Sequence, residues 1–526
     1  MKYLLTLILS ALNLLSLAQN STPQIEITGI ERDAIQQTLT VNYALSDADN
    51  DACEIWLKIS LDGGIYFGMV SQDKITGHVG LNIKTSNTRS LVWDYSGLRK
   101  GIENINIRLF ASDHKPVNIT EMVNQVNQTK LLSTLEAIVG ERHFTAAPNK
   151  LAEVRTFIKD AFSDANIQTE GHDFALSNTN MQNILGRKPG AKDEGITYII
   201  DGHFDGVPNS PAADDNGSAI AGMLEALRIL SLYSFENSIR FIGFDAEELG
   251  LVGSQNYIVN GIKPFEDIRG VLNLEMIGFY SNEPNTQILP AGFGFLFPQA
   301  AQKVVFDQNR GNFLFTCANT NSNPLLKAFK DASAKYVPKL RLITVSVPGT
   351  GSIAPDLRRS DHAPFWDAGL EALMITDTSE FRNSNYHTTK DKTDTLNLEF
   401  MQKVVQATLA TIAELAIPIS ANFDEADLSD VLNIKEHHDE STSEISIFPN
   451  PSNGLLFLNV KGAKTGFRSR VEVYELTGKR VYREVLNFKA GTSNSEINLQ
   501  HLAKGSYLLI LNFENTTKSI GFIIAD

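Results

Sequence analysis

The stretch ITYIID (196–201) runs directly into Gly202-His203-Phe204-Asp205. A short apolar run that leads into such a loop predicts a buried strand in the middle of the chain. Three further short apolar runs follow it: SIRFIGF (238–244), GVLNL (270–274) and EALMITD (371–377). Continuous apolar runs that alternate with helical stretches indicate a mainly parallel sheet that is buried on both faces. Helical patterns at 217–233 and 399–416 supply the covering layers. We therefore predict one α/β domain over residues 119–418.

Both flanks of this domain have the period-two pattern of β-strands. Residues 22–115 alternate apolar and polar positions between turn clusters, which predicts a small antiparallel β-sandwich. This stretch holds no cluster of metal-ligand residue types, so we expect a spacer or binding role. Residues 443–526 predict a second, smaller β-sandwich. Between the α/β domain and that sandwich, residues 419–442 are rich in acids and predict a solvated linker.

The N-terminus carries the pattern of an export signal. Residues 1–18 place one lysine before an apolar run that ends in Ser16-Leu17-Ala18, so we predict a cleaved signal peptide with Gln19 as the new N-terminus. No other stretch reaches about 18 apolar residues, and we expect no transmembrane helix in the mature protein. The formal net charge of −15 is poorly suited to binding nucleic acid. The two cysteines, Cys53 and Cys317, form no disulfide framework.

Ligand-type side chains follow the apolar runs of the α/β domain. In open α/β sheets, the ligand crevice lies beyond the carboxyl ends of the strands. The candidates that fall there or at the start of a helix are His203, Asp215, Glu248, Glu275 and His387. Each alone has an ordinary explanation; an Asp before a helix, for example, is usually an N-cap. Their shared position favours one functional site.

Imidazole and carboxylate ligands suit Zn²⁺ and tolerate Co²⁺ or Mn²⁺. Two divalent cations would be balanced by three carboxylates and one hydroxide, which favours two metals with Asp215 as the bridge. Asp205 follows His203 by two residues and is placed to accept the other imidazole N–H. Glu247 precedes Glu248, points elsewhere, and is free to act as a general base.

These residues lie in the segments HFD, ADDNGSA, DAEELGLVGS, NLEMIG, SDHAPFW and NYHTTKD, which together resemble the co-catalytic dizinc aminopeptidases of the bacterial leucyl-aminopeptidase type, peptidase family M28. The resemblance covers most of 119–418 and implies a zinc-exopeptidase fold. It implies that His203, Asp215 and Glu275 hold one zinc, and that Asp215, Glu248 and His387 hold the other. It also implies that Glu247 is the base, that a cis peptide follows Asp215, and that Tyr386 steadies the oxyanion.

Several alternatives stay open at this point. The family most often has Asp at the position of Glu275, and it also contains carboxypeptidases and glutaminyl cyclases. Arg358 and Arg359 are candidates for pairing with a substrate carboxylate, although they are more simply read as surface cations. His362 is not a ligand in this family, so we read its segment as structural or pocket-lining. A non-catalytic surface binding protein that keeps the fold is the alternative of another class.

The C-terminal segments FPNPSNG (448–454), VYELTGKRV (473–481) and LAKGSYLLIL (502–511) resemble the type A C-terminal sorting domain of type IX secretion. The resemblance implies export across the outer membrane of a Gram-negative bacterium, with this domain either removed or used as an anchor. We therefore predict a secreted or cell-surface zinc metallopeptidase that hydrolyses N-terminal residues from peptides. Its expected partners are peptide substrates and the type IX secretion machinery.

Overall fold

A computed structural model of the protein describes residues 20–98, 105–176, 179–428, 444–463, 467–475, 480–513 and 516–525. These residues form two compact units: a large unit that ends at Ala426 and a small unit made mainly of residues 427–526. The predicted signal peptide at 1–18 lies outside the described residues, as do residues 429–442 of the predicted linker.

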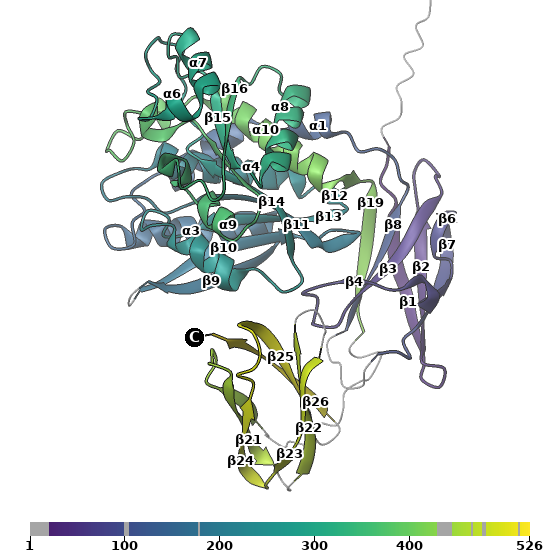
Figure 1. Ribbon diagram of the computed structural model, residues 1–526. Helices are drawn as coiled ribbons and strands as arrows, with labels where there is room; N and C mark the ends of the chain where they lie inside the picture. Colours follow the sequence, from purple (N-terminus) through teal and green to yellow (C-terminus); the bar gives the residue numbers. More distant parts are fainter. Residues whose placement is uncertain are drawn as a thin grey trace, which may run out of the picture. The chain divides into compact units, whose positions relative to one another are not determined.

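An eight-stranded sheet with the order β16-β15-β17-β14-β11-β13-β10-β9 forms the centre of the large unit (Figure 1). Its strands are β9 (Gln168–Leu176), β10 (Thr179–Lys188), β11 (Asp193–His203), β13 (Asn237–Phe244), β14 (Asp267–Glu275), β15 (Leu314–Asn319), β16 (Leu342–Val347) and β17 (Ala372–Thr376). The predicted apolar runs correspond to β11, β13, β14 and β17, and these four strands are parallel neighbours.

The sheet as a whole is mixed rather than mainly parallel. β10 is antiparallel to both β13 and β9, and β15 is antiparallel to β17. The β9–β10 hairpin has no counterpart in our sequence prediction. β9 reads QTEGHDFAL and buries only Phe174, because it is the edge strand of the sheet. An edge strand that faces solvent has no continuous apolar run to reveal it.

Side chains of the parallel strands alternate between two hydrophobic cores, one on each face of the sheet. Ile200 and Leu272 belong to the first core, whereas their neighbours Ile199 and Val271 belong to the second. This is the period of two that a strand dictates.

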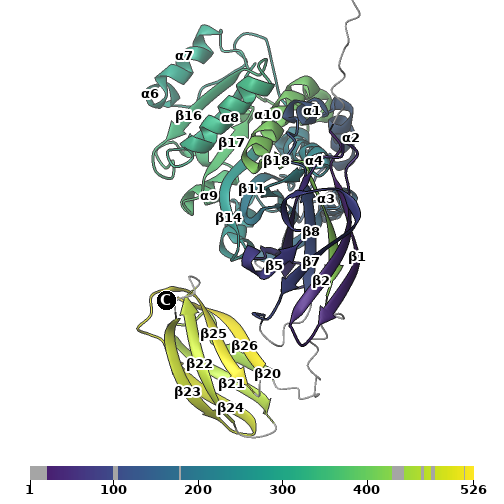
Figure 2. The same cartoon turned by 90° about the vertical axis from the view of Figure 1, so that its right-hand side faces the viewer.

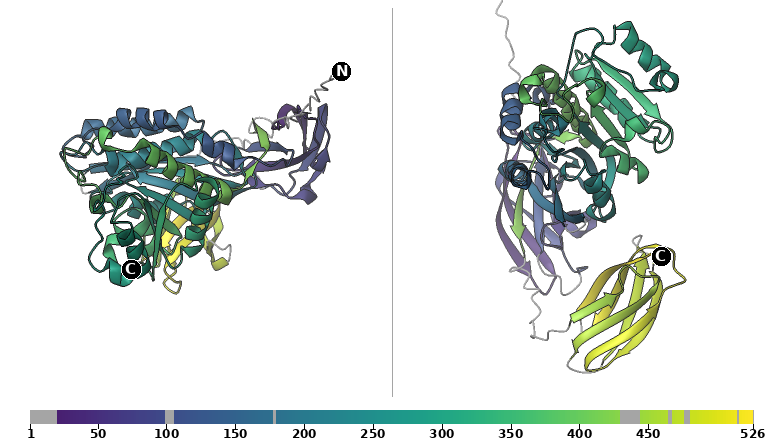
Figure 3. Two further views of the ribbon diagram at one scale, coloured as in Figure 1. Left: turned by 90° about the horizontal axis from the view of Figure 1, so that it is seen from above. Right: turned by 90° about the vertical axis from the view of Figure 1, so that its left-hand side faces the viewer.

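Helices cover both cores (Figure 3). The first core is covered by α1 (Ile119–Asn124), α2 (Gln128–Ile138), α3 (Pro148–Asp164), α4 (Ala219–Leu230), α8 (Asn323–Tyr336) and α10 (Leu398–Ala416). The second is covered by α6 (Phe293–Leu296), α7 (Pro298–Phe306) and α9 (His362–Asp367), and α5 (Val252–Asn256) lies near its edge. Within the described residues, each helix is too short or too polar to cross a bilayer.

Two smaller sheets form the N-terminal part of the large unit, with the orders β1-β2-β7-β5 and β19-β8-β3-β4, and β6 pairs with β3 (Figure 2). The strands are β1 (Gln24–Asp33), β2 (Thr38–Ser46), β3 (Cys53–Ser60), β4 (Gly68–Met69), β5 (Ile75–Gly77), β6 (Gly80–Ile83), β7 (Ser86–Asp94) and β8 (Asn106–Ser112). Their inward residues, such as Leu39, Val41 and Leu57, are fully buried.

The start of the predicted linker is a strand instead. After α10, the chain forms β18 (Pro418–Ile419), which pairs with β12 (Ser234–Phe235), and then β19 (Ala421–Asp427) beside β8 (Figure 1). The acids that suggested a solvated segment have partners here. Asp424 accepts the backbone N–H of Ile27 at 2.7 Å, and Glu425 pairs with Arg108 at 2.8 Å.

The small unit consists of two antiparallel sheets, β20-β21-β24 and β23-β22-β25-β26 (Figure 2). Its strands are β20 (Glu444–Phe448), β21 (Leu455–Ala463), β22 (Phe467–Glu475), β23 (Arg480–Phe488), β24 (Gly491–Asn498), β25 (Gly505–Phe513) and β26 (Thr516–Ile524). Alternate residues such as Leu456, Leu458 and Val460 are buried in a core between the sheets. Gly454 ends the FPNPSNG turn with φ of 92°, a backbone conformation that favours glycine.

Candidate metal centre

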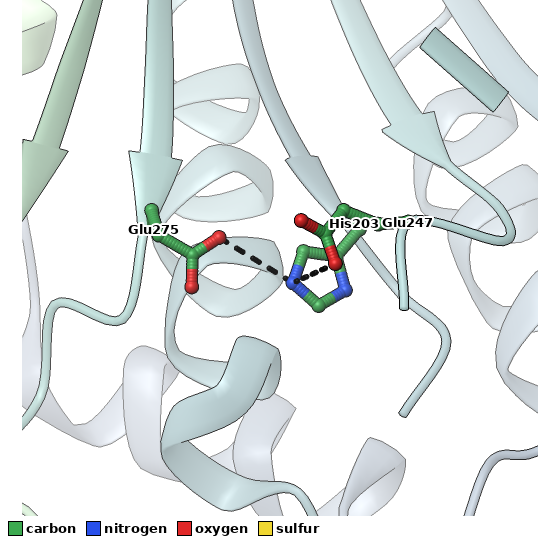
Figure 4. Close-up of side chains that lie close together, drawn as sticks. All are labelled: His203, Glu247 and Glu275. Carbon is green, nitrogen blue, oxygen red and sulfur yellow. Dashed lines mark ion pairs between the residues drawn. The ribbon is translucent and has the colours of Figure 1, made fainter. Parts of the chain in front are cut away.

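The ends of three neighbouring parallel strands bring the predicted site residues to one edge of the sheet. His203 is the last residue of β11, Glu275 is the last residue of β14, and Glu247 and Glu248 lie in the loop after β13. Because β13 and β14 flank β11, these side chains converge; Figure 4 shows His203, Glu247 and Glu275 pointing toward one another. His387 reaches the same place from the loop after β17.

The ligand-type atoms form two groups with Asp215 between them. His203 Nε2 lies 3.4 Å from Glu275 Oε2 and 3.4 Å from Asp215 Oδ1. His387 Nε2 lies 2.9 Å from Asp215 Oδ2 and 3.3 Å from Glu248 Oε2. The two oxygens of Asp215 therefore face different histidines, which is the arrangement that a bridging carboxylate needs.

Glu247 stands apart from Glu248, its neighbour in the chain. Its Oε2 lies 3.8 Å from His203 Nε2, so it belongs to the His203 group, whereas Glu248 belongs to the His387 group. Consecutive residues of the loop thus face different halves of the centre. The side chain of Glu247 is almost fully buried. Glu247 completes a three-residue set with His203 and Glu275 by distance, and Asp215 Oδ1 also lies 3.4 Å from His203 Nε2.

An irregular turn, Ala213–Ser218, positions Asp215 ahead of α4. The peptide bond between Asp215 and Asn216 is cis. Asp391 Oδ1 accepts the backbone N–H of Asp214 at 2.9 Å, and Oδ2 accepts that of Asp215 at 3.1 Å. Asn216 donates to the carbonyl of Leu274 at 3.0 Å. Asp215 does not act as an N-cap, because α4 begins without a side-chain cap.

The buried carboxylate of Asp205 contacts both His203 and the loop after β13. Its Oδ1 lies 3.3 Å from His203 Nδ1 and also accepts the backbone N–H of Glu247 at 3.1 Å. Its Oδ2 accepts the backbone N–H of Glu248 at 3.2 Å. One side chain therefore lies beside the imidazole and fixes the backbone that carries both glutamates.

The pKa values reflect a surplus of negative charge around the histidines. Burial alone would lower the pKa of His203, but the carboxylates, Glu247 foremost, raise it well above its usual value. Burial also lowers the pKa of His387, but hydrogen bonds to Asp215 and Glu248 outweigh this effect and raise the pKa to about 10. Burial raises the pKa of Glu247 strongly and that of Glu248 to about 7.

The residues present fit a divalent cation. Within the described residues, Glu248 Oε1 is buried and has no hydrogen-bond partner, although an orphaned buried oxygen is costly. Imidazole nitrogens and carboxylate oxygens are the donors that Zn²⁺ takes at about 2.0–2.2 Å. Glu275 is further oriented by Ser360, whose hydroxyl donates to its Oε2 at 2.7 Å.

Tyr386 borders the centre. Its ring stacks on His387 with centroids 3.7 Å apart, and its hydroxyl accepts from Arg359 at 3.3 Å. Arg359 also forms an ion pair with Glu380, whereas Arg358 pairs with Asp367 at 2.7 Å, away from the centre.

His362, from the SDHAPFW segment, is fully buried and has a packing role. A ring nitrogen lies 2.8 Å from the Leu357 carbonyl, and the ring meets Trp366 edge-on. Burial lowers the pKa of His362 to about 4.

An apolar pocket opens beside Glu275. Its walls include Phe293, Phe313, Phe315, Ile343 and Met374, which come from β15, β16, β17 and the 280–313 segment. Charged side chains line it as well, namely Asp356, Arg359 and Glu380, together with the hydroxyl-bearing Tyr386.

Residues 183–412 match Peptidase family M28, and residues 446–525 match the Secretion system C-terminal sorting domain. The chain is 26% identical over 275 residues to the uncharacterized protein YfbL of Escherichia coli, covering 50% of this chain and 79% of that protein. It is 28% identical over 247 residues to aminopeptidase YwaD of Bacillus subtilis, covering 46% of each.

Among solved structures, BSAP, a zinc aminopeptidase from Bacillus subtilis, aligns with 28% identity and a TM-score of 0.34, covering 46% of this chain and 52% of that one. The chain thus spans about half the length of the two Bacillus proteins. The first matched segment contains the candidate metal-ligand residues, and the second contains the C-terminal sheets described above. The chain therefore carries a domain of peptidase family M28 followed by a secretion system C-terminal sorting domain.

Proposed function

We propose that this chain is an exported aminopeptidase that uses two zinc ions. The observation that carries the proposal is the pair of three-residue groups around Asp215, each with one imidazole and carboxylate oxygens. His203, Asp215 and Glu275 would hold one zinc, and Asp215, Glu248 and His387 the other. Zinc, when bound in such a site, polarises a substrate carbonyl and makes water a better nucleophile near neutral pH.

Glu247 serves as the general base in this proposal. Its carboxylate is buried among the ligand groups without being needed to bridge them, and Asp205 fixes its backbone. It takes a proton from the attacking water and returns it to the leaving amine. Tyr386 directs its hydroxyl toward the oxygen of the scissile carbonyl, where one such donor contributes roughly 3 kcal/mol to the transition state.

The charged side chains that line the pocket favour an amino end over a carboxyl end. Among the described residues that line it, Arg359 is the cation and is paired with Glu380, while Asp356 adds a further negative charge. A free N-terminal ammonium is attracted to such a rim, and a C-terminal carboxylate is repelled. The aromatic and aliphatic walls suit an apolar side chain on the N-terminal residue.

The test is a matched set of leucyl peptides with free, N-acetylated or amidated termini, assayed with and without zinc. We expect cleavage of the free and C-amidated peptides, resistance of the acetylated one, and loss of activity with a chelator. Equal turnover of acetylated and free peptides would overturn the aminopeptidase assignment. Release of pyroglutamate from an N-terminal glutaminyl peptide would instead identify a glutaminyl cyclase.

We also propose that the C-terminal unit directs the chain, after signal-peptide cleavage, to type IX secretion. The match at 446–525 supports this. Expression of the full chain and of a chain ending at residue 442 in a bacterium with this secretion system tests it. The full chain should reach the cell surface or the medium, and the truncated chain should stay in the periplasm.

A further inference from the structure

The large unit contains a second cavity, far from the metal centre, with a volume of about 650 Å³. Helices α2, α3 and α4 line one side of it, and the turn after β10 and strands β8 and β19 line the other. Small-molecule sites in proteins usually have volumes of about 300–1,000 Å³. The cavity is therefore large enough to hold an organic ligand.

This cavity lies at the opposite end of the central sheet from the metal centre. His203 ends β11, whereas Gly190 and Ala191, which line the cavity, come just before β11 begins. β11 has 11 residues, so its two ends are roughly 33 Å apart at about 3.3 Å per residue. The metal centre lies at the carboxyl ends of the parallel strands, and the cavity lies near their amino ends.

The cavity gathers cations in a chain whose net charge is −15. The charged residues that line it are Arg108, Lys130, Arg187, Lys188 and Arg228, with Asp164 and Glu225. Each arginine has a carboxylate partner: Arg108 pairs with Glu425, Arg187 with Glu194, and Arg228 with Glu225.

Lys188 differs from these arginines. Its ammonium donates to the backbone carbonyl of Ser231 at 2.9 Å, and within the described residues it has no ion pair with a carboxylate. An ammonium offers three donors, so two remain after this bond. Burial alone lowers the pKa of Lys188 to about 8, as expected for an ammonium that has lost water without gaining a counter-ion.

Apolar side chains line the same cavity as Lys188. Leu224, Leu227 and Phe235 form buried walls, and Phe157 adds an aromatic ring. At the edge, Leu232 is 68% exposed and Phe423 is 41% exposed. A ligand that complements these features carries one negative group for Lys188 and a hydrophobic body for the walls.

We propose that this cavity is a binding site for an organic carboxylate with an apolar body, of the size of a medium-chain fatty acid, whose carboxylate pairs with the ammonium of Lys188. The pairing supplies the counter-ion that Lys188 lacks, and the apolar body replaces water against Leu224, Leu227 and Phe235. Such a site is independent of peptide hydrolysis, because its residues lie at the other end of the sheet.

The experiment measures decanoate binding to the full chain by titration calorimetry, with 1-decanol as the uncharged ligand of the same chain length. Lys188→Met removes the ammonium and keeps an apolar side chain of similar length. Lys327→Met is the matched control, because Lys327 lies on α8 in an exposed pair with Asp331, outside the cavity. Ala161→Phe narrows the cavity and leaves Lys188 in place.

We expect saturable decanoate binding that weakens at least about tenfold in Lys188→Met, as loss of a hydrogen bond to a charged group predicts. Binding should be unchanged in Lys327→Met and lost in Ala161→Phe, while decanol should bind wild type and Lys188→Met alike. Absence of saturable decanoate binding, equal binding of decanoate and decanol to wild type, or full binding by Lys188→Met would each overturn the proposal. Peptidase activity enters none of these readouts.

Discussion

Asp205→Asn tests whether one buried carboxylate organises the proposed zinc centre. The wild-type side chain accepts the backbone N–H groups of Glu247 and Glu248, at 3.1 and 3.2 Å, and lies 3.3 Å from His203 Nδ1. An amide of the same size keeps only one acceptor oxygen and turns an NH₂ group toward a donor. One charge-assisted hydrogen bond is therefore lost outright.

The size of the effect follows from that count. A hydrogen bond to a charged group contributes about 1.5–3 kcal/mol, which is a factor of about 10–150 in an equilibrium constant. Loss of a partner that orients a metal-bound histidine costs about 10–100-fold in metal affinity. We expect the zinc affinity of the site that contains His203 to fall by about 10–100-fold in Asp205→Asn. The value of kcat/KM at limiting zinc should fall in parallel.

The assay titrates chelator-stripped protein with buffered zinc and follows bound metal and leucyl-peptide cleavage together. Circular dichroism establishes that the variant is folded. Asp367→Asn is the matched control, because Asp367 is exposed and pairs only with Arg358 among the described residues. If folded Asp205→Asn bound zinc within about threefold of wild type, a difference well below the expected range, the role assigned to Asp205 would be refuted.

Three other outcomes follow from the same structure. Glu247→Gln should keep zinc, measured by elemental analysis, and lose at least about a hundredfold in turnover, since the amide cannot accept a proton; loss of zinc from the folded variant would make Glu247 a ligand. Leucyl substrates should exceed alanyl ones in kcat/KM by about tenfold or more, because each buried CH₂ contributes about 0.8 kcal/mol; equal rates would show that the apolar pocket does not receive this side chain. His362 is buried with a pKa of about 4, below the value of about 6.5 in an unfolded chain, so the unfolded state binds more protons between these values. The free energy of unfolding, measured in urea, should therefore fall by about 2 kcal/mol from pH 7 to pH 5 through this residue, and His362→Gln should lack that increment.

The parallel part of the sheet and the convergence of the candidate ligand residues could be predicted because both leave local signals. A buried parallel strand is an apolar run, and the residues just after it must lie at its carboxyl end. That logic predicts that His203, Glu248 and Glu275 lie at one edge of the sheet. In the structure His203 lies 3.4 Å from Glu275, and Glu248 lies 3.3 Å from His387 in the neighbouring group.

Supporting residues leave no such signal. Ser360 contacts Glu275 across 85 residues of sequence, and Asp391 contacts Asp215 across 176. A single serine or aspartate in a loop is common and has no spacing that marks it as a partner. Charge alone was also misleading at Asp424 and Glu425, where acids that suggested a solvated linker belong to β19 and have partners in the N-terminal sheets.

The attachment of the N-terminal sheets depends on the same long-range contacts. Glu194 lies at the start of β11 and is 1% exposed, and Lys58 of β3 donates to it at 3.0 Å. Lys58 also donates to the Gly190 carbonyl at 2.9 Å, and Trp56 donates to that of Ala191 at 3.0 Å. Removing one member of a buried ion pair costs about 3–5 kcal/mol, because the other charge stays buried without a partner. Since β19 also returns from the end of the α/β domain to pair beside β8, the N-terminal sheets are part of the same folded unit rather than a detached spacer.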